Sequence, residues 1–304
     1  MTITDPQTDT GPDAHGFTIQ KKKKWPWTVG AIALAAAIAA AAIINSNAGT
    51  KSPNTVAGAT LTVVTAEGNH AEQALVNFVA EEIAPKYGIK VAFKGLADST
   101  TLNRAVSTGE VAGTIYQHKL WLSQVLEANP DFKLAAATPV FRWGFGIWSA
   151  KYKSVEEIPN GATISLYSDP ANEAQGLWLL ERAGLIKLDA SVDKWKATQK
   201  DISENPKGIK FKLLDFAAQS RSLADLDATV GYTEYYVAAK VPLEQQIFAP
   251  AAPDEFAGQL TIGTEYADTE NVKNLVKAFQ DPAVQEFLRT DPAVKDLLVP
   301  IAAE

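Results

Sequence analysis

The sequence predicts an α/β fold of two lobes that follows a single membrane-spanning helix, and three observations carry this prediction. Short β-rich runs alternate with helical patterns from residue 60 to residue 290, which is typical of a mostly parallel sheet flanked by helices. An extended run rich in aromatic residues and glycine, 142–149, interrupts this alternation before a second α/β series begins. Residues 25–49 contain no charged side chain. The two series indicate two lobes, each with its own sheet.

The composition is that of a globular protein and excludes several kinds of chemistry. The chain has 304 residues, of which 46% are hydrophobic and 21% charged, enough for the core of one large domain or two lobes. It contains no cysteine, which excludes disulfides, thiolate metal sites and a lipid anchor on cysteine. The three histidines, His15, His70 and His118, lie in separate segments, so no metal and no cofactor is expected. The net charge of −7 argues against nucleic acid as a partner.

The N-terminal residues indicate a tail, a membrane anchor and a spacer. Residues 1–24 are polar and end in four lysines, and the apolar segment 25–44 just reaches the length of about 20 residues that a helix needs to cross a membrane. These lysines predict a cytoplasmic tail and an extracytoplasmic body from Lys51 onward. The alternative is a secretory signal cleaved near Ser46-Asn47-Ala48, which would release the body. Residues 45–59 are expected to be a flexible linker.

The elements of the first series follow from hydrophobic periodicity. Leu61–Thr65 is β-rich and ends in turn residues, and apolar residues recur near helical spacing over Ala71–Pro85. The same criteria predict strands at Ile89–Phe93, Ala112–Tyr116 and Lys133–Ala137. Helices are predicted between them, at Thr101–Thr108 and His118–Ala128. Strands separated by single helices indicate βαβ units.

The second series begins after the extended run 142–149. Ala162–Tyr167 is predicted as a strand and Ala171–Ala183 as a helix. The elements expected after them are a strand at Ile209–Asp215, a helical turn at Ser222–Leu226, a short strand at Thr229–Gly231, an extended run at Gln259–Thr264, and helices at Val272–Gln280 and Ala283–Arg289.

Two stretches stand out in a sequence that has no nucleotide-binding loop and no nucleophile-elbow motif. Residues 116–121 (Tyr-Gln-His-Lys-Leu-Trp) follow a predicted strand, and in open α/β sheets ligands bind beyond the carboxyl ends of strands. Residues 168–176 place Asp169 and Pro170 at a helix start, where free backbone N–H groups would accept an anion or a carboxylate. The alternative is that both stretches are ordinary strand-to-helix turns.

Four segments, in this order, carry a resemblance to a known family. They are 116–119 (Tyr-Gln-His-Lys), 169–172 (Asp-Pro-Ala-Asn), 181–188 (Glu-Arg-Ala-Gly-Leu-Ile-Lys-Leu) and 201–207 (Asp-Ile-Ser-Glu-Asn-Pro-Lys). Together they resemble the NlpA-type lipoproteins, the methionine-binding components of ABC importers, and the resemblance extends over residues 60–289.

The resemblance implies a two-lobed, periplasmic-binding-protein-like fold that closes on a small solute by hinge motion. Lobe 1 would comprise residues 60–141 and 263–304, and lobe 2 residues 142–262. An ABC permease and its cytoplasmic ATPase would be the partners, and no enzymatic activity is implied. Carried over position by position, the ligand-binding residues in the interlobe cleft would be Tyr116, His118, Trp121, Trp143, Phe145, Asn172, Gln175, Tyr232 and Glu234.

Several positions depart from the family pattern. The family usually carries a lipid-modified cysteine, so the membrane helix would substitute for it here. Gln175 stands where methionine binders place an arginine that pairs with the ligand carboxylate, and Glu234 stands where they have asparagine. Trp121 and Trp143 replace tyrosines. These changes reverse the local charge, unless another cation such as Arg142 takes the place of the arginine.

The expected function is a membrane-tethered, extracytoplasmic solute-binding component of an ABC importer, with methionine or a related amino-acid-like solute as ligand. The altered positions keep a neutral or cationic amine open as the alternative ligand. Trp121, Trp143, Phe145 and Trp148 would offer aromatic faces to an amine and Glu234 a counter-charge, although at least one of these rings is expected in a lobe core.

Two other functional classes have less support in the sequence. An exported enzyme on the same fold would need Glu234 and His118 as its acid/base pair, and neither has a recognisable partner. A sensory or scaffold role would need a signalling motif in the tail, and residues 1–24 contain none.

Overall fold

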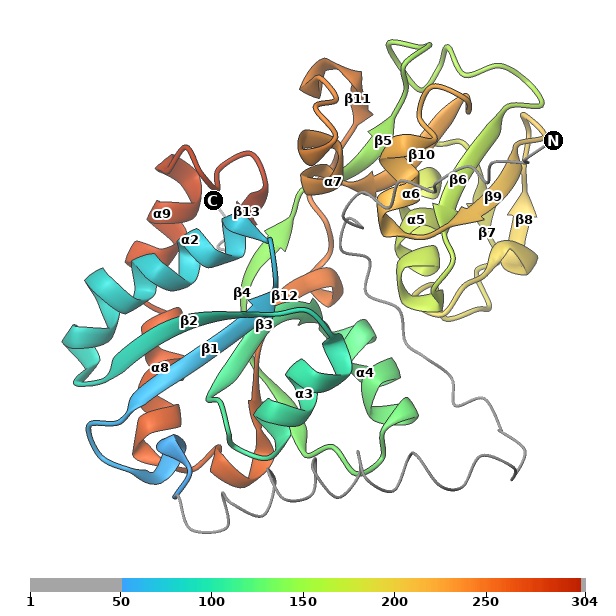
Figure 1. Ribbon diagram of the computed structural model, residues 1–304. Coiled ribbons are helices and arrows are strands. Elements are labelled where there is room, and N and C mark those ends of the chain that lie inside the picture. Colours follow the sequence, from blue (N-terminus) through green and yellow to red (C-terminus); the bar gives the residue numbers. More distant parts are fainter. Residues whose placement is uncertain (1–50, 302–304) are drawn as a thin grey trace, which may run out of the picture. The chain divides into compact units, whose positions relative to one another are not determined.

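A computed structural model describes residues 51–301 of the chain. The expected tail at 1–24, the expected membrane helix at 25–44 and residues 45–50 of the expected linker lie outside the described residues. Among the described residues, no helix combines the length and apolarity needed to cross a bilayer. They form two compact units, which we call the larger unit (residues 51–143 and 251–301) and the smaller unit (residues 144–250) (Figure 1).

The larger unit contains a six-stranded mixed sheet with the strand order β13-β4-β12-β3-β1-β2. β1 pairs in parallel with β2 and β3, whereas β12 is antiparallel to β3 and β4, and β13 is antiparallel to β4. β1, β2, β3 and β4 therefore all run in the same direction. The strands are β1 (Thr60–Ala66), β2 (Lys90–Leu96), β3 (Gly113–His118), β4 (Leu134–Trp143), β12 (Ala257–Gly263) and β13 (Leu298–Pro300).

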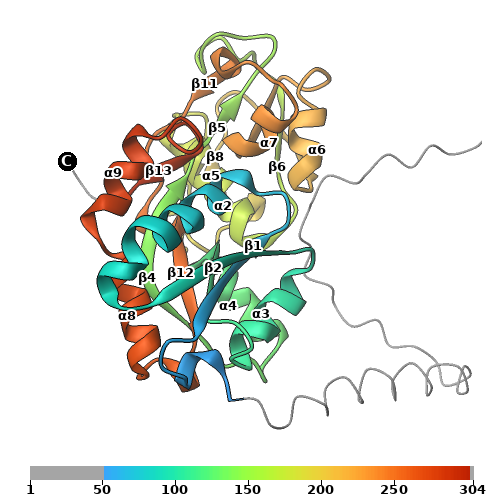
Figure 2. The ribbon, with the colours of Figure 1, turned by 60° about the vertical axis from the view of Figure 1, so that its left-hand side comes forward.

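Helices cover both faces of the larger sheet. The two views place α2 beside α9, and α3 and α4 on the other side of the sheet (Figures 1 and 2). This follows from right-handed crossovers, because the chain steps outward from β1 to β2 and then back to β3. The helices are α2 (His70–Phe78), α3 (Ser99–Ser107), α4 (Lys119–Ala128), α8 (Glu270–Phe279) and α9 (Pro282–Thr290).

Short helical segments join these elements. The helix expected over residues 71–85 is α2 followed by a π-helical segment and a 3-10 segment, which ends at Gly88 with a φ of +68°. The short segments of the larger unit are η1 (Pro53–Thr55), η2 (Val79–Ile83), η3 (Ala84–Tyr87), η6 (Asp254–Phe256) and η7 (Thr264–Tyr266).

Residues 51–56, expected within the flexible linker, pack on the larger unit instead. The Ser52 hydroxyl donates to Gly109 O (2.6 Å), and Asn54 Nδ2 donates to Val111 O (3.4 Å). Asn54 is fully buried, and Asn271 Nδ2 donates to Pro53 O (3.0 Å). These contacts hold this segment against the loop before β3 and against α8.

The chain leaves and re-enters the larger unit at different points from the lobe boundaries expected at 142 and 262. Its contacts divide it after Trp143 and after Pro250. The reason is that β12 pairs with β4 over its whole length and with β3 from Gly258 to Thr261, so the residues of β12 and those just before it belong to the larger unit.

The smaller unit contains a five-stranded mixed sheet with the order β11-β5-β10-β6-β9. β6 is parallel to β9 and β10, and β5 is antiparallel to β10 and β11. Its strands are β5 (Phe145–Trp148), β6 (Thr163–Tyr167), β9 (Lys210–Leu214), β10 (Ala228–Tyr232) and β11 (Gln246–Phe248), and β7 (Lys187–Leu188) pairs separately with β8 (Ile202–Glu204). Its helices are α5 (Pro170–Arg182), α6 (Phe216–Arg221) and α7 (Thr233–Ala238), with 3-10 segments η4 (Gln199–Asp201) and η5 (Leu243–Gln245).

The helical turn expected at 222–226 is present as one turn, in which Leu226 N donates to Ser222 O (3.1 Å), and a helix that was not expected, α6, precedes it. The side chain of Asp215 accepts from Ala218 N (2.9 Å) and starts the helix there. Residues 222–225 form turns that lead into β10. The extended run 142–149 is likewise two strands, the end of β4 and all of β5, separated at Gly144.

Trp148 lies in the core of the smaller unit. Its side chain is fully buried, its ring stacks on that of Tyr236 with centroids 4.1 Å apart and an angle of 4°, and its indole N–H donates to Gly231 O (3.3 Å). Leu223 completes this cluster. The expectation that at least one of the four aromatic residues packs a core is therefore confirmed for Trp148.

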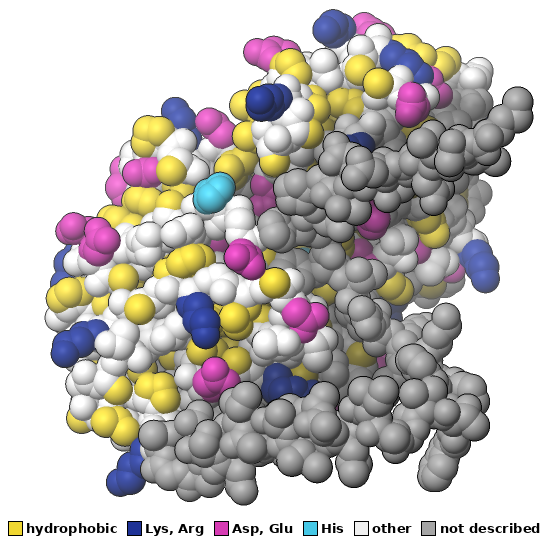
Figure 3. Space-filling model, in the orientation of Figure 1, with side chains coloured by type: hydrophobic (Ala, Val, Ile, Leu, Met, Phe, Trp, Pro, Cys, Tyr) yellow, Lys and Arg dark blue, Asp and Glu magenta, His cyan; other side chains and the backbone are white. Residues whose placement is uncertain are grey.

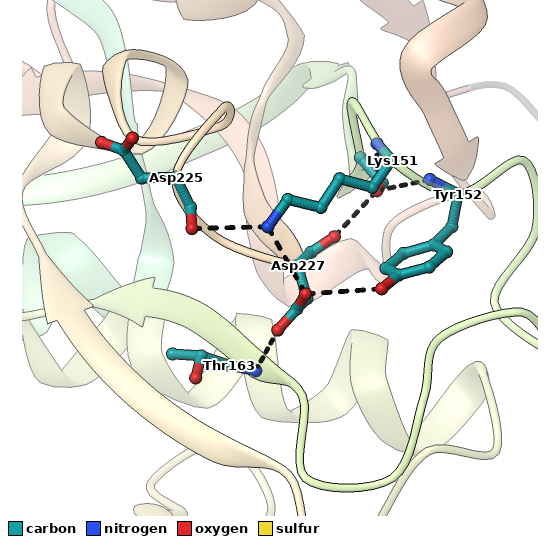
Figure 4. A network of polar contacts seen from close by, with 6 residues as sticks. Lys151, Tyr152, Thr163, Asp225 and Asp227 are labelled. Atoms are coloured by element: carbon teal, nitrogen blue, oxygen red, sulfur yellow. Dashed lines mark hydrogen bonds and ion pairs between the residues drawn. The ribbon is translucent and has the colours of Figure 1, made fainter.

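A polar network ties the starts of β6 and β10 to the end of β5 (Figure 4). The Asp227 carboxylate accepts from Thr163 N (2.8 Å) and lies 3.5 Å from both Lys151 Nζ and the Tyr152 hydroxyl. The Ser149 hydroxyl donates to Asp227 O (2.8 Å). Because β6 and β10 begin here, this network marks the amino edge of the sheet, opposite to the edge at which these strands end.

Candidate functional site

In the larger unit, aromatic and polar side chains gather where its parallel-running strands end. β3 ends at His118 and β4 at Trp143, and because both strands run in the same direction their carboxyl ends share one edge. Trp121 follows in the first turn of α4. These three expected site residues lie close together, and we call them, with Glu72 and Phe256, the larger-unit cluster.

His118 is held as the N-cap of α4. Its Nδ1 accepts from Trp121 N (3.2 Å), which places the proton of a neutral imidazole on Nε2. The ring is 3% exposed and meets Phe256 and Trp143 edge-on, with centroids 5.2 and 6.4 Å away. Nδ1 is therefore engaged in the helix start and does not remain available for a ligand.

Glu72, which sequence reasoning did not single out, is the buried carboxylate of this cluster. It is 1% exposed, and its Oε1 accepts from the indole N–H of Trp143 (3.1 Å). Its Oε2 accepts from the hydroxyl of Thr65, near the end of β1. A first-turn acid also interacts favourably with the dipole of α2, whose N-cap Asn69 accepts from Glu72 N (3.1 Å). The spacing Asn69-x-x-Glu72 was the available signal, but it indicated only a helix start.

Tyr116 lies beside the larger-unit cluster and is tied to α3. Its hydroxyl accepts from Asn103 Nδ2 (2.6 Å), and Asn103 Oδ1 accepts from Gln117 Nε2 (2.9 Å). Burial raises the pKa of the Tyr116 phenol, which a hydrogen bond with Trp121 partly offsets. This hydrogen bond with Trp121 connects Tyr116 to the larger-unit cluster.

In the smaller unit, the corresponding edge is built by β6, β10 and β5. β6 ends at Tyr167 and β10 at Tyr232, while the antiparallel β5 begins at Phe145, so these three rings share one edge. The ring centroid of Phe145 is 4.9 Å from that of Tyr232 and 6.3 Å from that of Tyr167. The hydroxyl of Tyr167 accepts from Tyr232 N (3.1 Å).

Tyr232 connects this edge to the first turns of α5. Its hydroxyl donates toward Asn172 Oδ1 (2.5 Å) and Gln175 Oε1 (2.7 Å), and all three side chains are buried. Burial raises the pKa of Tyr232, and the charges of Asp169 and Glu234 raise it further. Asp169 is linked to the Tyr232 hydroxyl through the Asn172 amide, and Glu234 lies two residues after Tyr232, in the first turn of α7.

Two further rings, Phe216 and Tyr235, extend this aromatic edge and were not expected from the sequence. Phe216 begins α6, and its ring lies 4.7 Å from that of Tyr167 and 6.2 Å from that of Tyr232, centroid to centroid. The centroid of Tyr235 in α7 is 5.9 Å from that of Phe216. Phe216, Tyr235 and Glu234 are half-buried, so they form the accessible part of the edge. We define the smaller-unit cluster as five rings and four polar side chains. They are Phe145, Tyr167, Phe216, Tyr232 and Tyr235, with Asp169, Asn172, Gln175 and Glu234.

The free helix start expected after Tyr167 is already filled by a carboxylate of the chain itself. Asp169 Oδ1 accepts from Asn172 N (3.0 Å) and from Asn172 Nδ2 (2.9 Å), and the same carboxylate accepts from Ala171 N. Pro170 has no N–H, and Glu173 N donates to Asp169 O (2.9 Å). The expectation of an anion site at the start of α5 is therefore wrong, because its N–H groups are satisfied.

Arg142, the cation that could have replaced an arginine at position 175, is engaged elsewhere. Its guanidinium forms an ion pair with Asp254 and donates to Pro300 O (3.0 Å), which holds β13 and η6 beside β4. Gln175 itself is 1% exposed and bonded to Tyr232, so it provides an uncharged amide in the smaller-unit cluster.

The face of the described residues that is visible in Figure 3 shows no large patch of a single charge. Acidic and basic side chains are scattered singly over the visible face, with apolar ones between them (Figure 3). Within residues 51–301, no group of three or more His, Asp or Glu side chains is placed to hold a metal ion. The two clusters remain the places where polar and aromatic groups converge.

The mixed sheets, the order of the elements and the aromatic strand ends are those of an α/β substrate-binding protein with two units. More specifically, the chain belongs to the NlpA lipoprotein family, whose model matches residues 61–302. It is 31% identical over 213 residues to the methionine-binding lipoprotein MetQ of Bacillus subtilis, covering 69% of this chain and 78% of that protein. It is 30% identical over 258 residues to the D-methionine-binding lipoprotein MetQ of Escherichia coli, covering 84% and 92%.

A solved structure agrees with this assignment. The chain resembles a periplasmic substrate-binding protein of an ABC transporter from Coxiella burnetii, with a TM-score of 0.69, 29% identity, and coverage of 79% of this chain and 99% of that one. The relatives are binding proteins of ABC transporters and not enzymes, in agreement with the sequence-based expectation.

Proposed function

We propose that this protein is the solute-binding component of an ABC importer and that its solute is a small, amino-acid-like molecule of the methionine class. The observation that carries the proposal is the smaller-unit cluster, where a buried Tyr232 hydroxyl links Asn172 and Gln175 beneath an edge of half-exposed rings. Such a combination of apolar rings and a few fixed polar groups suits a small solute with an apolar side chain. The family membership supports the same conclusion.

The residues proposed to contact or support the solute are those expected from the sequence, with five additions. In the larger unit they are Tyr116, His118, Trp121 and Trp143, to which Glu72 and Phe256 are added; in the smaller unit they are Phe145, Asn172, Gln175, Tyr232 and Glu234, to which Tyr167, Phe216 and Tyr235 are added. A permease and a cytoplasmic ATPase are the proposed partners. No step of catalysis is proposed.

The test is the identity and fate of the solute. The full chain is purified in detergent, any small molecule that travels with it is identified by mass spectrometry, and binding is measured by calorimetry against a panel of amino acids and their derivatives. We expect one solute to be retained or bound with 1:1 stoichiometry and recovered unchanged after incubation. Conversion of the bound solute would instead support the enzyme alternative, and the absence of any retained or bound solute would refute the proposal.

Tyr232→Phe is expected to weaken solute binding about fivefold to tenfold, because it removes the hydroxyl that orients Asn172 and Gln175. The measurement is the calorimetric Kd for the solute that the unmodified protein binds. Tyr152→Phe is the matched control, since it removes a phenol hydroxyl from the same unit at the opposite, amino edge of the sheet (Figure 4). Equal Kd values for the Tyr232→Phe variant and the unmodified protein would remove Tyr232 from the proposed site.

We also propose that residues 25–44 anchor the protein in the membrane with residues 1–24 inside, and that residues 45–50 lead to the extracytoplasmic body. The support is the uncharged apolar stretch that follows four lysines. The intact mass of the protein extracted from membranes is expected to include the N-terminal segment. If the protein is instead found in a soluble fraction, with the mass of a chain that starts near residue 49, the N-terminal segment is a cleaved signal.

A further inference from the structure

The charge distribution of the smaller-unit cluster limits the solutes that it can accept. Two carboxylates belong to this cluster. Asp169 accepts from the Asn172 amide, whose oxygen accepts from the Tyr232 hydroxyl, and Glu234 lies two residues after Tyr232 in the first turn of α7. The charge of each raises the pKa of the Tyr232 phenol. Asp169 accepts from backbone N–H groups and from the Asn172 amide, and these partners carry no net positive charge. A solute beside Tyr232 therefore meets negative charge.

Several backbone N–H groups that could attract a solute carboxylate are already in use. Backbone N–H groups at a helix start are the usual acceptor site for an anion, and those of α5 are occupied by Asp169. At the start of α7, Tyr232 N donates to the Tyr167 hydroxyl and Thr233 N donates to Gly144 O (2.8 Å). At α6, Ala218 N donates to the Asp215 carboxylate.

Three lysines of the smaller unit contact groups in other parts of it. Lys151 pairs with Asp227 at the amino edge, Lys187 pairs with Glu204 in the small hairpin, and Lys207 donates to carbonyls, among them Ile158 O (2.6 Å). Position 175, close to Tyr232, holds an amide. A free carboxylate of a solute beside Tyr232 would thus be desolvated close to Asp169 and would meet an uncharged amide at position 175.

The same edge suits a positive charge. Phe145, Phe216, Tyr232 and Tyr235 present aromatic faces, and a ligand ammonium is attracted both to such faces and to a nearby carboxylate. Glu234 is half-buried in the first turn of α7, next to the ring of Tyr235 in the chain.

We propose that the solute of this protein is an amine with an apolar side chain and no free carboxylate, such as an amino acid whose carboxyl group is masked as an amide. This inference rests on the proposed function and specifies its substrate class. Glu234 and Asp169 provide the negative charge that selects the amine, and the rings of the smaller-unit cluster contact its apolar part. An unmodified amino acid binds less tightly because its carboxylate faces these two acids.

Three probes that share one side chain test the inference. L-methioninamide carries a single positive charge, L-methionine is a zwitterion, and N-acetyl-L-methionine carries a single negative charge. Calorimetry on the full chain, purified in detergent and dialysed free of solute, is expected to give a Kd for the amide at least about tenfold lower than that for methionine, and no binding of the N-acetyl compound. A Kd for methionine equal to or lower than that for the amide would overturn the inference and leave the proposed function intact.

Two isosteric variants test which residues carry the preference. Glu234→Gln and Asp169→Asn are each expected to weaken binding of the amide about tenfold and to change the Kd for methionine less, because each removes one negative charge. Asparagine still caps α5, so the second variant keeps the helix start. Glu156→Gln is the matched control, an exposed acid of the same unit. If both variants retain the preference for the amide, the two acids are not its source and the inference is wrong.

If none of the three probes binds, mass spectrometry of the solute retained by the protein decides. A retained amine without a carboxylate supports the inference, and a retained solute with a free carboxylate overturns the inference alone. When no solute is retained and none binds, both the inference and the proposed function are refuted.

Discussion

Replacing Trp148 with alanine is expected to lower the free energy of unfolding of the smaller unit by about 4 kcal/mol. The indole is fully buried, stacks on Tyr236 at 4.1 Å and donates to Gly231 O. Alanine removes the buried ring, leaves a cavity beside Leu223 and Tyr236, and leaves the Gly231 carbonyl without its donor. Substitution of an exposed residue of this unit is expected to lower the free energy of unfolding much less.

The measurement is denaturant unfolding followed by hydrogen exchange, because the chain has two units and a single global transition cannot be assumed. Trp148→Phe separates the two contributions: it keeps a ring against Tyr236 and removes the N–H, so it should cost less than the alanine variant. Leu213→Ala, at a side chain of β9 that is 45% exposed, is the control and is expected to cost less than about 1 kcal/mol. A loss for Trp148→Ala as small as that for Leu213→Ala would show that the Trp148–Tyr236 stack does not hold the unit together.

The buried strands of the fold could be predicted from the sequence because they are short runs rich in β-branched and other strand-favouring residues. The expected strand Leu61–Thr65 lies within β1, and the expected strand Ala162–Tyr167 covers β6. α7 could not be predicted, because a helix of six residues has too few turns to show a helical period. The edge strands β11 and β13 have only three residues each and exist through pairing with β5 and β4. Such pairing is a property of tertiary structure and leaves no local signal.

The candidate site shows the same division between local and tertiary information. His118 could be identified because it follows a predicted strand, at the edge where ligands bind in this type of sheet. Trp143 and Tyr232, which also end strands, were expected only from the resemblance to the family. Glu72 could not be identified, because in the sequence it is an ordinary acid in the first turn of a helix. Only the fold brings the indole of Trp143, 71 positions away, to its carboxylate.

His118 illustrates how a correctly placed residue can differ in its role. The sequence places it at the end of a strand, and it lies there, but its Nδ1 is committed to the start of α4. The strand end and the helix start coincide at this residue, so one side chain serves as a cap and lines the cluster with its ring. Because the cap engages Nδ1, this atom is not available to a solute.

Asp169 is expected to make the stability of the smaller unit fall as the pH rises from about 4 to about 7. Burial raises the pKa of its carboxyl to about 6 from an ordinary value of 3.8, and the hydrogen bonds from Asn172 and Ala171 only partly offset this. Between these two values the folded chain binds a proton that the unfolded chain has lost, so the folded state is favoured at low pH. The contribution is fully present below pH 4 and is lost as the pH passes through 6. A difference of about 2 pKa units corresponds to about 3 kcal/mol.

Asp169→Asn isolates this contribution, because asparagine caps α5 nearly as well as aspartate but does not titrate. All other groups titrate alike in both proteins, so the difference between their free energies of unfolding depends on Asp169 alone. Relative to the variant, the unmodified protein should lose about 3 kcal/mol between pH 4 and pH 7, measured by denaturant unfolding at each pH. Asp215→Asn, the same exchange at the exposed N-cap of α6, is the control for the exchange itself. A difference between the unmodified protein and Asp169→Asn that stays constant over this range would mean that Asp169 is solvated in the folded protein. In that case the carboxylate would be screened from Tyr232 as well, and Glu234 alone would remain to favour an amine.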